Sequence, residues 1–197
     1  MIVSFYSLVI DRALRRLRQR TPEFAGMKPG DKVLDVCCGT GDQAAYLAWL
    51  GIDAWGIDLD PKMIAVAERK RQKSGKENLH FQLADATALP FGDGFFDYST
   101  ISLALHEKSL ETQQKVIAEM QRVTKKGGGR LILADYPVPA RRFYRFAEMV
   151  VGGEHYLCFK ATQALGGMEA LAKTLDLGIE EASSAVGGSF NLLKIKN

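Results

Sequence analysis

A glycine-containing turn between a strand-like and a helix-like segment constrains this chain more than any other feature. Residues 33–42 read VLDVCCGTGD, so an apolar run passes through Gly39 and Gly41 directly into a helix-like segment at 42–50. Glycine adopts positive φ and lets the backbone approach a ligand closely. The following helix offers free N–H groups and the positive end of its dipole. The pattern therefore predicts a ligand-binding turn at the end of a strand.

The rest of the chain alternates between strand-like and helix-like segments. A first helix is expected over residues 5–20, ended by Thr21-Pro22 because the residue before proline avoids the α region. Strands are expected at 32–37, 52–58, 79–83, 95–103 and 130–134, and helices at 42–50, 61–73 and from Leu110 to the glycines at 127–129. Helices with glycine breaks at 152–153 and 166–167 follow over 137–174, and a hairpin joins 179–186 to 189–195. This order predicts an α/β fold with a largely parallel sheet and an antiparallel end.

The composition indicates one globular domain. The chain has 197 residues, of which 47% are hydrophobic, and its net charge of +3 is too mild to suggest a nucleic-acid partner. No apolar run approaches the ~18–20 residues that span a bilayer, and the N-terminus, apolar first and basic second, predicts no secretory signal. Three cysteines, with Cys37 and Cys38 adjacent, predict neither a disulfide framework nor a metal site, and they favour a cytoplasmic location.

An acidic residue at the end of the second predicted strand narrows the choice of ligand. Asp58 can accept both ribose hydroxyls of a bound nucleoside. Nicotinamide dinucleotides and S-adenosylmethionine are both bound in this way, and Gly39-x-Gly41-x-x-Ala44 satisfies the dinucleotide pattern. Asp35 favours S-adenosylmethionine, because a carboxylate late in the first strand suits its ammonium group better than a pyrophosphate.

Four stretches taken together resemble the class I S-adenosylmethionine-dependent methyltransferases. They are VLDVCCGTG at 33–41, GIDLDPKM at 56–63, LADA with the later LPF and FD at 83–97, and GGGRL at 127–131. The small-molecule branch similar to the ubiquinone and menaquinone methyltransferases also shows the CGTGD run and the ADATxLPF run. Cys37 departs from the wider family, which usually has the first glycine of its loop there.

This resemblance implies the fold and its organisation. The fold is a doubly wound three-layer sandwich, Rossmann-like, with a seven-stranded, mostly parallel sheet and an antiparallel last strand. The resemblance implies a single methyltransferase domain over 1–197. Its parts are an N-terminal cap helix (1–30), a cofactor-binding core (31–135), substrate-shaping helices (136–175) and a terminal strand hairpin (176–197).

The same resemblance implies which residues bind S-adenosylmethionine and its product, S-adenosylhomocysteine (SAH). They are Asp35, Cys37, Gly39, Gly41, Asp58, Leu59, Met63, Asp85, Ala86 and Ser102. The glycine turn passes under the methionine part, and Asp58 takes the ribose hydroxyls. Leu59 and Met63 line the adenine, and Asp85 with the Ala86 backbone binds its amino edge. Ser102, with the residues that follow it to His106, faces the reacting sulfonium.

Histidines and aromatic residues are the candidates on the acceptor side. His106 follows the fourth predicted strand and titrates near neutrality, so it is a candidate both for a general base and for a substrate-lining residue. Tyr136, His155 and Tyr156 are further substrate-lining candidates, in a segment rich in aromatic residues. Helix packing on the sheet is the competing interpretation for each single ring.

The sequence therefore predicts methyl transfer from S-adenosylmethionine to a small-molecule acceptor, with C-, O- and N-methylation all open. An NAD-dependent oxidoreductase and a non-catalytic S-adenosylmethionine-binding protein are the alternatives. Neither a metal nor a nucleic acid is expected. A solvated face is favoured over a membrane-surface contact for the arginines of the N-terminal helix.

Overall fold

The computed structural model describes the backbone of residues 2–197 and the side chains of residues 14–197. The helices of this range are α1 (Ile2–Ala25), α2 (Asp42–Trp49), α3 (Pro61–Ser74), α4 (Leu110–Val123), α5 (Arg142–Val151), α6 (Gly153–Leu165) and α7 (Gly167–Thr174). The strands are β1 (Lys32–Val36), β2 (Asp53–Asp58), β3 (Leu79–Leu83), β4 (Tyr98–Ser102), β5 (Arg130–Asp135), β6 (Ile179–Ala185) and β7 (Phe190–Lys196). Through β5 each strand is followed by a helix except β3, which a loop joins to β4, as the sequence predicts.

The strands form one seven-stranded sheet in the order β3-β2-β1-β4-β5-β7-β6. β1 to β5 pair in parallel, and β7 runs antiparallel to both β5 and β6. The predicted doubly wound fold with a mostly parallel, seven-stranded sheet is confirmed. The direction of winding reverses between β1 and β4, and open sheets bind ligands at such a switch point, beyond the carboxyl ends of the strands.

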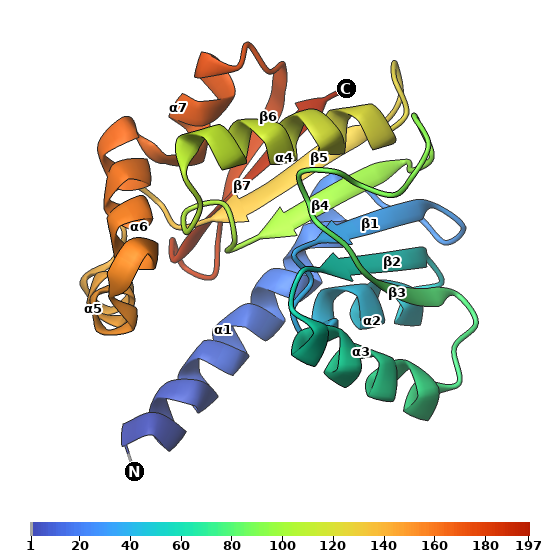
Figure 1. The fold of residues 1–197 in the computed structure, drawn as a ribbon, viewed down its shortest axis with the longest axis horizontal. Coiled ribbons are helices and arrows are strands. Elements are labelled where there is room, and N and C mark those ends of the chain that lie inside the picture. The colour runs from blue at the N-terminus through green and yellow to red at the C-terminus, as the bar shows by residue number, and fades with distance from the viewer. Residues whose placement is uncertain (1) are drawn as a thin grey trace.

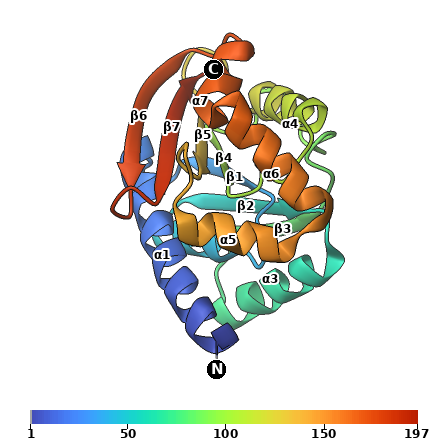
Figure 2. The same ribbon diagram turned by 90° about the vertical axis from the view of Figure 1, so that its left-hand side faces the viewer.

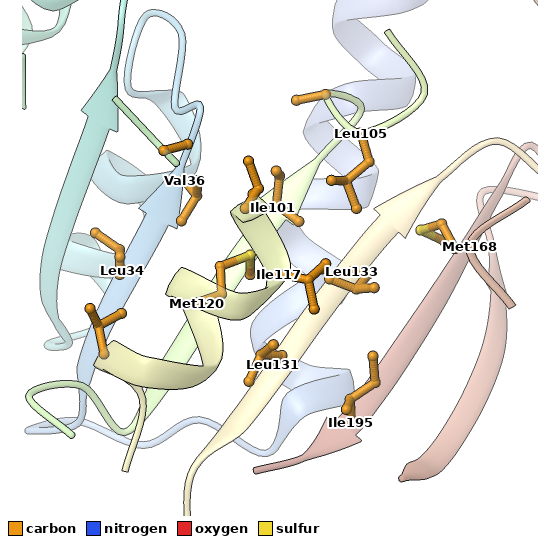
Figure 3. Close-up of a cluster of buried hydrophobic side chains, with 14 of the residues drawn as sticks. Leu34, Val36, Ile101, Leu105, Ile117, Met120, Leu131, Leu133, Met168 and Ile195 are labelled. Atoms are coloured by element: carbon orange, nitrogen blue, oxygen red, sulfur yellow. The ribbon is translucent and has the colours of Figure 1, made fainter. Parts of the chain in front are cut away.

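Helices cover both faces of the sheet (Figure 1). On one face α4 and α7 pack on the largest core cluster, into which β1 directs Leu34 and Val36. Figure 3 shows Ile117 and Met120 of α4 directed onto the strands in this cluster. On the other face α1 and α2 cover two smaller clusters, and Val33 of β1 belongs to one of them. Alternate residues of β1 thus reach opposite layers, because successive side chains of a strand point to opposite faces.

Two helices lie in front of the edge at which the parallel strands end. Figure 2 looks onto this edge and shows α5 and α6 crossing it, with α1 below them. The glycine breaks predicted at 152–153 and 166–167 separate α5 from α6 and α6 from α7, and these glycines have positive φ. These helices therefore lie over the carboxyl ends of the parallel strands, close to the turn after β1 and the end of β4.

The prediction that Thr21-Pro22 ends the first helix is wrong. α1 continues through Pro22 to Ala25. Proline cannot donate a backbone hydrogen bond to the carbonyl four residues earlier, which here belongs to Arg18. Gln43 Nε2 of α2 instead donates to the Arg18 carbonyl at 3.4 Å, and the buried Thr21 hydroxyl donates to the Leu17 carbonyl at 2.9 Å. These contacts and the burial of Phe24 offset the lost bond. The fourth strand is also shorter than predicted, at Tyr98–Ser102.

We expect Met120→Ala to lower the free energy of unfolding by about 2–5 kcal/mol, because the side chain is fully buried between α4 and the sheet and its loss leaves a cavity. Urea denaturation followed by circular dichroism measures the change. The matched control is Lys115→Ala on the exposed side of the same helix, which removes only a solvent-screened ion pair with Glu111 and should leave the free energy of unfolding nearly unchanged. Equal losses in the two variants would contradict the packing described.

Candidate functional site

The turn after β1 is held in a conformation that favours glycine. Cys37, Gly39 and Gly41 have φ of 55°, 54° and 76°. At Gly41 a Cβ would lie 2.4 Å from the Phe81 ring, so the position has no room for a side chain. Cys37 adopts the left-handed region without being glycine, at a cost of roughly 1–2 kcal/mol. The residue that departs from the family pattern thus keeps the backbone conformation that a glycine there would have.

Asp58 fixes this turn to the end of β2. Its carboxylate accepts hydrogen bonds from the Gly39 N–H at 2.8 Å and the Asp60 N–H at 2.9 Å. A carboxylate has about four acceptor positions, so two remain for a ligand. Asp58 is partly exposed beside the turn, where sequence reasoning expects ribose hydroxyls.

Two cavities flank the turn, and Cys37 lines both. One has a volume of about 210 Å³ and is bounded by Asp35, Cys38–Thr40 and Ser102–Leu103 of the sheet edge and by Leu14, Leu17 and Arg18 of α1. We call it the turn cavity. The other, also about 210 Å³, is bounded by Ile57, Leu59, Ala84–Thr87, Lys108, Thr112 and Val116. We call it the β3 cavity. Of the candidate cofactor residues, Asp35, Gly39 and Ser102 line the turn cavity, and Leu59, Asp85 and Ala86 line the β3 cavity. Gly41, Asp58 and Met63 line neither cavity.

The turn cavity contains unsatisfied polar groups. Asp35 is almost completely buried, and this burial raises the pKa of its carboxyl from 3.8 to about 7, although the Thr100 hydroxyl donates to it at 3.0 Å. Ser102 Oγ is buried and has no hydrogen-bond partner among the described residues. Beside it Leu103 has a φ of 55°. Unpaired polar groups and strained backbone are costly, and they persist where a ligand uses them.

Arg18 gives the turn cavity a positive group as well. Its guanidinium lies 3.4 Å from Asp42 at the start of α2, and α1 places it at the cavity wall. Sequence reasoning missed Arg18, because it lies between the arginines at 12, 16 and 20 that form a helical stripe and was not distinguished from other surface charges. A carboxylate and a guanidinium facing one cavity complement a zwitterionic ligand.

The β3 cavity has an apolar wall. Leu59 exposes 68% of its surface there, which is unusual for a leucine next to a sheet edge. Ala86 is buried, while Asp85 is exposed and accepts from the backbone and hydroxyl of Thr87 at 2.8 Å, which lowers its pKa. Met63 lies partly exposed on α3 and is not among the residues that bound the cavity.

A cluster of histidines and carboxylates lies beyond the end of β4. His106 Nδ1 is 2.6 Å from Asp135 Oδ1, and its Nε2 is 3.7 Å from Glu148 Oε1. Burial favours the neutral imidazole, but the charges of Asp135, Glu148 and Glu107 raise the pKa of His106 overall. The Tyr136 hydroxyl donates to Glu148 Oε1 at 3.0 Å.

His155 joins this cluster from α6. Its Nε2 is hydrogen-bonded to Glu148 Oε2, and its Nδ1 lies 3.2 Å from Glu107. The structure thus brings His106, Tyr136 and His155 together, whereas Tyr156 stacks with Phe159 at the edge of the group. Sequence reasoning missed Asp135, Glu148 and Glu107, since no spacing links three residues from separate segments.

Residues 33–128 match the family model of the methyltransferase domain. The chain is 40% identical over 133 residues to demethylmenaquinone methyltransferase of Beutenbergia cavernae, a match that covers 68% of this chain and 51% of that protein. A similar match, 38% identical over 128 residues, links it to demethylmenaquinone methyltransferase of Thermus thermophilus and covers 64% of this chain and 56% of that protein. The chain therefore spans about half the length of the curated relatives it matches.

Solved structures share the fold over most of the chain. One is a methyltransferase from Aquifex aeolicus that depends on S-adenosylmethionine (SAM). Its structure superposes with a TM-score of 0.69 and 19% sequence identity, and the match covers 90% of this chain and 88% of that chain. At this identity the likeness establishes the fold alone. Within the described part of the chain, no helix is both long enough and apolar enough to traverse a membrane.

We expect Asp35→Asn to be more stable than the unchanged protein at pH 8, in the absence of ligand. In the folded state the pKa of Asp35 is about 7, and in the unfolded state it is near 3.8. The folded state therefore holds the proton more tightly, and stability falls as the pH rises from about 4 to 7. Asparagine avoids this loss, so the gain in unfolding free energy can reach about 4 kcal/mol at pH 8.

Urea denaturation at pH 5 and pH 8 measures this difference. The gain should be about 1.6 kcal/mol at pH 5 and about 4 kcal/mol at pH 8. The control is Asp93→Asn at an exposed position, which should change the unfolding free energy by less than about 0.5 kcal/mol. A gain for Asp35→Asn that is the same at both pH values would show that ionisation of Asp35 is not its cause.

Proposed function

We propose that this chain, which belongs to the class I S-adenosylmethionine-dependent methyltransferases and is related to the menaquinone-biosynthesis enzymes, transfers a methyl group from S-adenosylmethionine to a small-molecule acceptor. The observation that carries the proposal is the pair of cavities joined at Cys37, with the free acceptor positions of Asp58 at the turn between them. One cavity has groups for a zwitterion and the other an apolar wall. An amino-acid group joined through ribose to adenine has this distribution of polarity.

The turn cavity is the proposed site of the methionine part. Asp35 would bind the ammonium group and Arg18 the carboxylate, so each charge of the ligand meets its opposite. Ser102 Oγ, buried without a partner in the described structure, would gain a hydrogen bond. Gly39 leaves its part of the cavity wall free of a side chain. A pyrophosphate in the same position would lie against the Asp35 carboxylate, which disfavours a nicotinamide dinucleotide.

The β3 cavity is the proposed site of adenine. Leu59 covers one face of the ring, with Met63 farther out on α3, and Asp85 and the Ala86 backbone meet the amino edge. Asp85 already accepts two hydrogen bonds from Thr87, which hold its carboxylate in place while leaving acceptor positions free. Asp58 would take the ribose hydroxyls between the two cavities.

The acceptor side is the region of His106, Tyr136, His155 and Tyr156. We propose His106 as the catalytic residue there, because it is buried at the end of β4, next in the chain to the Glu107-Lys108 pair that borders the β3 cavity. The aromatic rings around it form an apolar wall that excludes water. Such a wall suits an acceptor with an aromatic ring, and the relatives named demethylmenaquinone methyltransferase are consistent with a quinone-type acceptor.

Methyl transfer depends above all on the alignment of the acceptor with the methyl group of S-adenosylmethionine. When bound, S-adenosylmethionine supplies an electrophilic methyl group on a positively charged sulfur. The chain orients the two reactants in line, which can contribute up to roughly 7–11 kcal/mol to lowering the barrier. The buried position of His106 keeps solvent from the reacting atoms. We place the reaction in the cytoplasm, because three free cysteines suit a reducing compartment.

Calorimetric titration with SAH tests the cofactor site. We expect micromolar binding by the unchanged protein, no comparable binding of NADH, and about 10–100-fold weaker SAH binding by Asp58→Ala, which loses hydrogen bonds to a charged group. Asp53→Ala, at the opposite end of β2, is the matched control and should bind SAH normally. Binding of NADH alone would overturn the proposal, as would unchanged SAH affinity in Asp58→Ala.

The affinity for SAH should also depend on pH through Asp35. Because the pKa of Asp35 is about 7 and the ionised form binds an ammonium group, affinity should rise by about tenfold between pH 6 and pH 8. In Asp35→Asn the affinity should be weaker and nearly constant over this range. Calorimetric titration with SAH at three pH values between 6 and 8 measures this dependence. If the affinity of Asp35→Asn for SAH changed with pH as much as that of the unchanged protein, another group would be its cause.

A further inference from the structure

Three side chains from separate elements converge beyond the end of β4. His106 follows β4, Glu148 lies on α5 and His155 on α6, and each offers one ligand atom within 4.8 Å of the other two. His106 and Glu148 are buried, and His155 is partly buried. Figure 2 shows α5 and α6 side by side in front of the strand ends, which is how they bring their residues to His106.

Both imidazoles are oriented by carboxylates in the same way. Asp135 holds Nδ1 of His106 at 2.6 Å, and Glu107 holds Nδ1 of His155 at 3.2 Å. Each ring therefore turns its Nε2 towards Glu148. Histidines that bind metals almost always donate their other N–H to a carboxylate, a carbonyl or water, which fixes the tautomer and the ring orientation. Glu148 is fixed as well, by the Tyr136 hydroxyl.

The composition of the cluster suits a cation. Three carboxylate side chains, those of Asp135, Glu148 and Glu107, surround the two imidazoles. Asp135 and Glu148 expose only 3% and 8% of their side chains. Buried carboxylates are usually paired or coordinate metals, because burying an unpaired charge is costly. No lysine or arginine is paired with Asp135 or Glu148 among the described residues, and the lysine next to Glu107 faces the β3 cavity.

We propose that His106 Nε2, a Glu148 carboxylate oxygen and His155 Nε2 bind one divalent transition-metal ion. Two imidazole nitrogens and one carboxylate oxygen suit Zn²⁺ or Fe²⁺, with at least one coordination position left for another ligand. Metal–ligand bonds of about 2.0–2.2 Å draw His106 Nε2 and Glu148 closer than their present 3.7 Å. The ion replaces the hydrogen bond between Glu148 and His155.

The position of the cluster indicates what the open coordination position binds. Glu107 links His155 to Lys108, which lines the β3 cavity together with Cys37. The metal would thus lie on the acceptor side of the bound cofactor. Resting on the proposed function, we infer that the acceptor binds the ion through a phenol, enol or hydroxyl oxygen. His106 then acts on the acceptor by holding the ion.

A metal-bound oxygen loses its proton more readily, because the cation stabilises the anion. The acceptor O–H bond breaks and its proton leaves to solvent past the partly exposed Glu107. The electron pair of the anion forms the new bond to the methyl carbon, directly from oxygen or from a conjugated ring carbon. The bond between that carbon and sulfur breaks, and SAH leaves with the electron pair on a neutral sulfur. Where a ring carbon is methylated, that ring carbon then loses its own proton to solvent and the oxygen regains one.

Titration of the chelator-treated protein with Co²⁺ alone tests the site directly. Bound Co²⁺ has visible absorption bands whose intensity reports its coordination, and Zn²⁺ can be measured by its competition with Co²⁺. We expect one ion per chain with micromolar or tighter affinity. His155→Ala should weaken binding by at least about 100-fold, and Asp135→Asn, which keeps the shape but removes the orienting charge, by about 10–100-fold.

The chain offers a matched control in His80. It is partly buried and lies 3.0 Å from Asp53, so it is another histidine–carboxylate pair, but no third ligand is recorded beside it among the described residues. His80→Ala should bind Co²⁺ like the unchanged protein. Thermal denaturation adds a second measurement: Zn²⁺ should raise the melting temperature of the unchanged protein and of His80→Ala, but not that of His155→Ala.

The results with Co²⁺ and with SAH test the metal site and the methyltransferase proposal independently. If Co²⁺ fails to bind, or if His155→Ala binds it as well as His80→Ala does, the metal site is wrong whatever the result with SAH. A thiolate-to-cobalt charge-transfer band would place the ion on cysteine and would also overturn it. If Co²⁺ binds as expected while SAH does not, the metal site stands and the methyltransferase proposal fails. His155→Ala should retain SAH binding, which also shows that it is folded.

Discussion

The hydrogen bond from the Gly39 N–H to the Asp58 carboxylate ties the turn after β1 to the end of β2, and the arrangement of the site follows from it. The bond holds the turn open at the strand edge, so that one cavity forms on each side of Cys37. Gly41 adds to this constraint, because only a position without a side chain lets α2 begin against Phe81. A single carboxylate thus holds the backbone at two points, Gly39 and Asp60, and still has free acceptor positions.

Several groups at this edge are costly to the stability of the free protein. Asp35 is buried without a paired cation in contact, Ser102 Oγ lacks a partner within the described structure, and Cys37 and Leu103 adopt positive φ. Each of these lowers the stability of the unliganded chain. The apolar clusters on both faces of the sheet, from Leu34 and Met120 on one side to Leu47 on the other, supply the stability that tolerates them.

Sequence reasoning reached the fold because it depends on local patterns, and the candidate cofactor residues were selected from the same patterns. The order of elements follows from periodicity and from glycines, and residues such as Asp58 follow a strand end at a fixed distance from the turn. The length of α1 was not predictable, because Gln43, a residue of another helix, satisfies the carbonyl that Pro22 leaves free. The partners of His106 were not predictable either. Glu148 and His155 reach it only because α5 and α6 fold back over the strand ends, and no spacing in the sequence records that.

The groups around the turn after β1 and the groups beyond the end of β4 come from different stretches of the chain. Groups around the turn come mainly from residues 33–58, within the region that matches the methyltransferase domain, whereas Glu148 and His155 lie on α5 and α6, beyond residue 128. Mutations in these two helices can remodel what is recognised beyond the end of β4 without disturbing the Gly39–Asp58 bond. One stretch of the gene can therefore change without altering the residues that hold the turn.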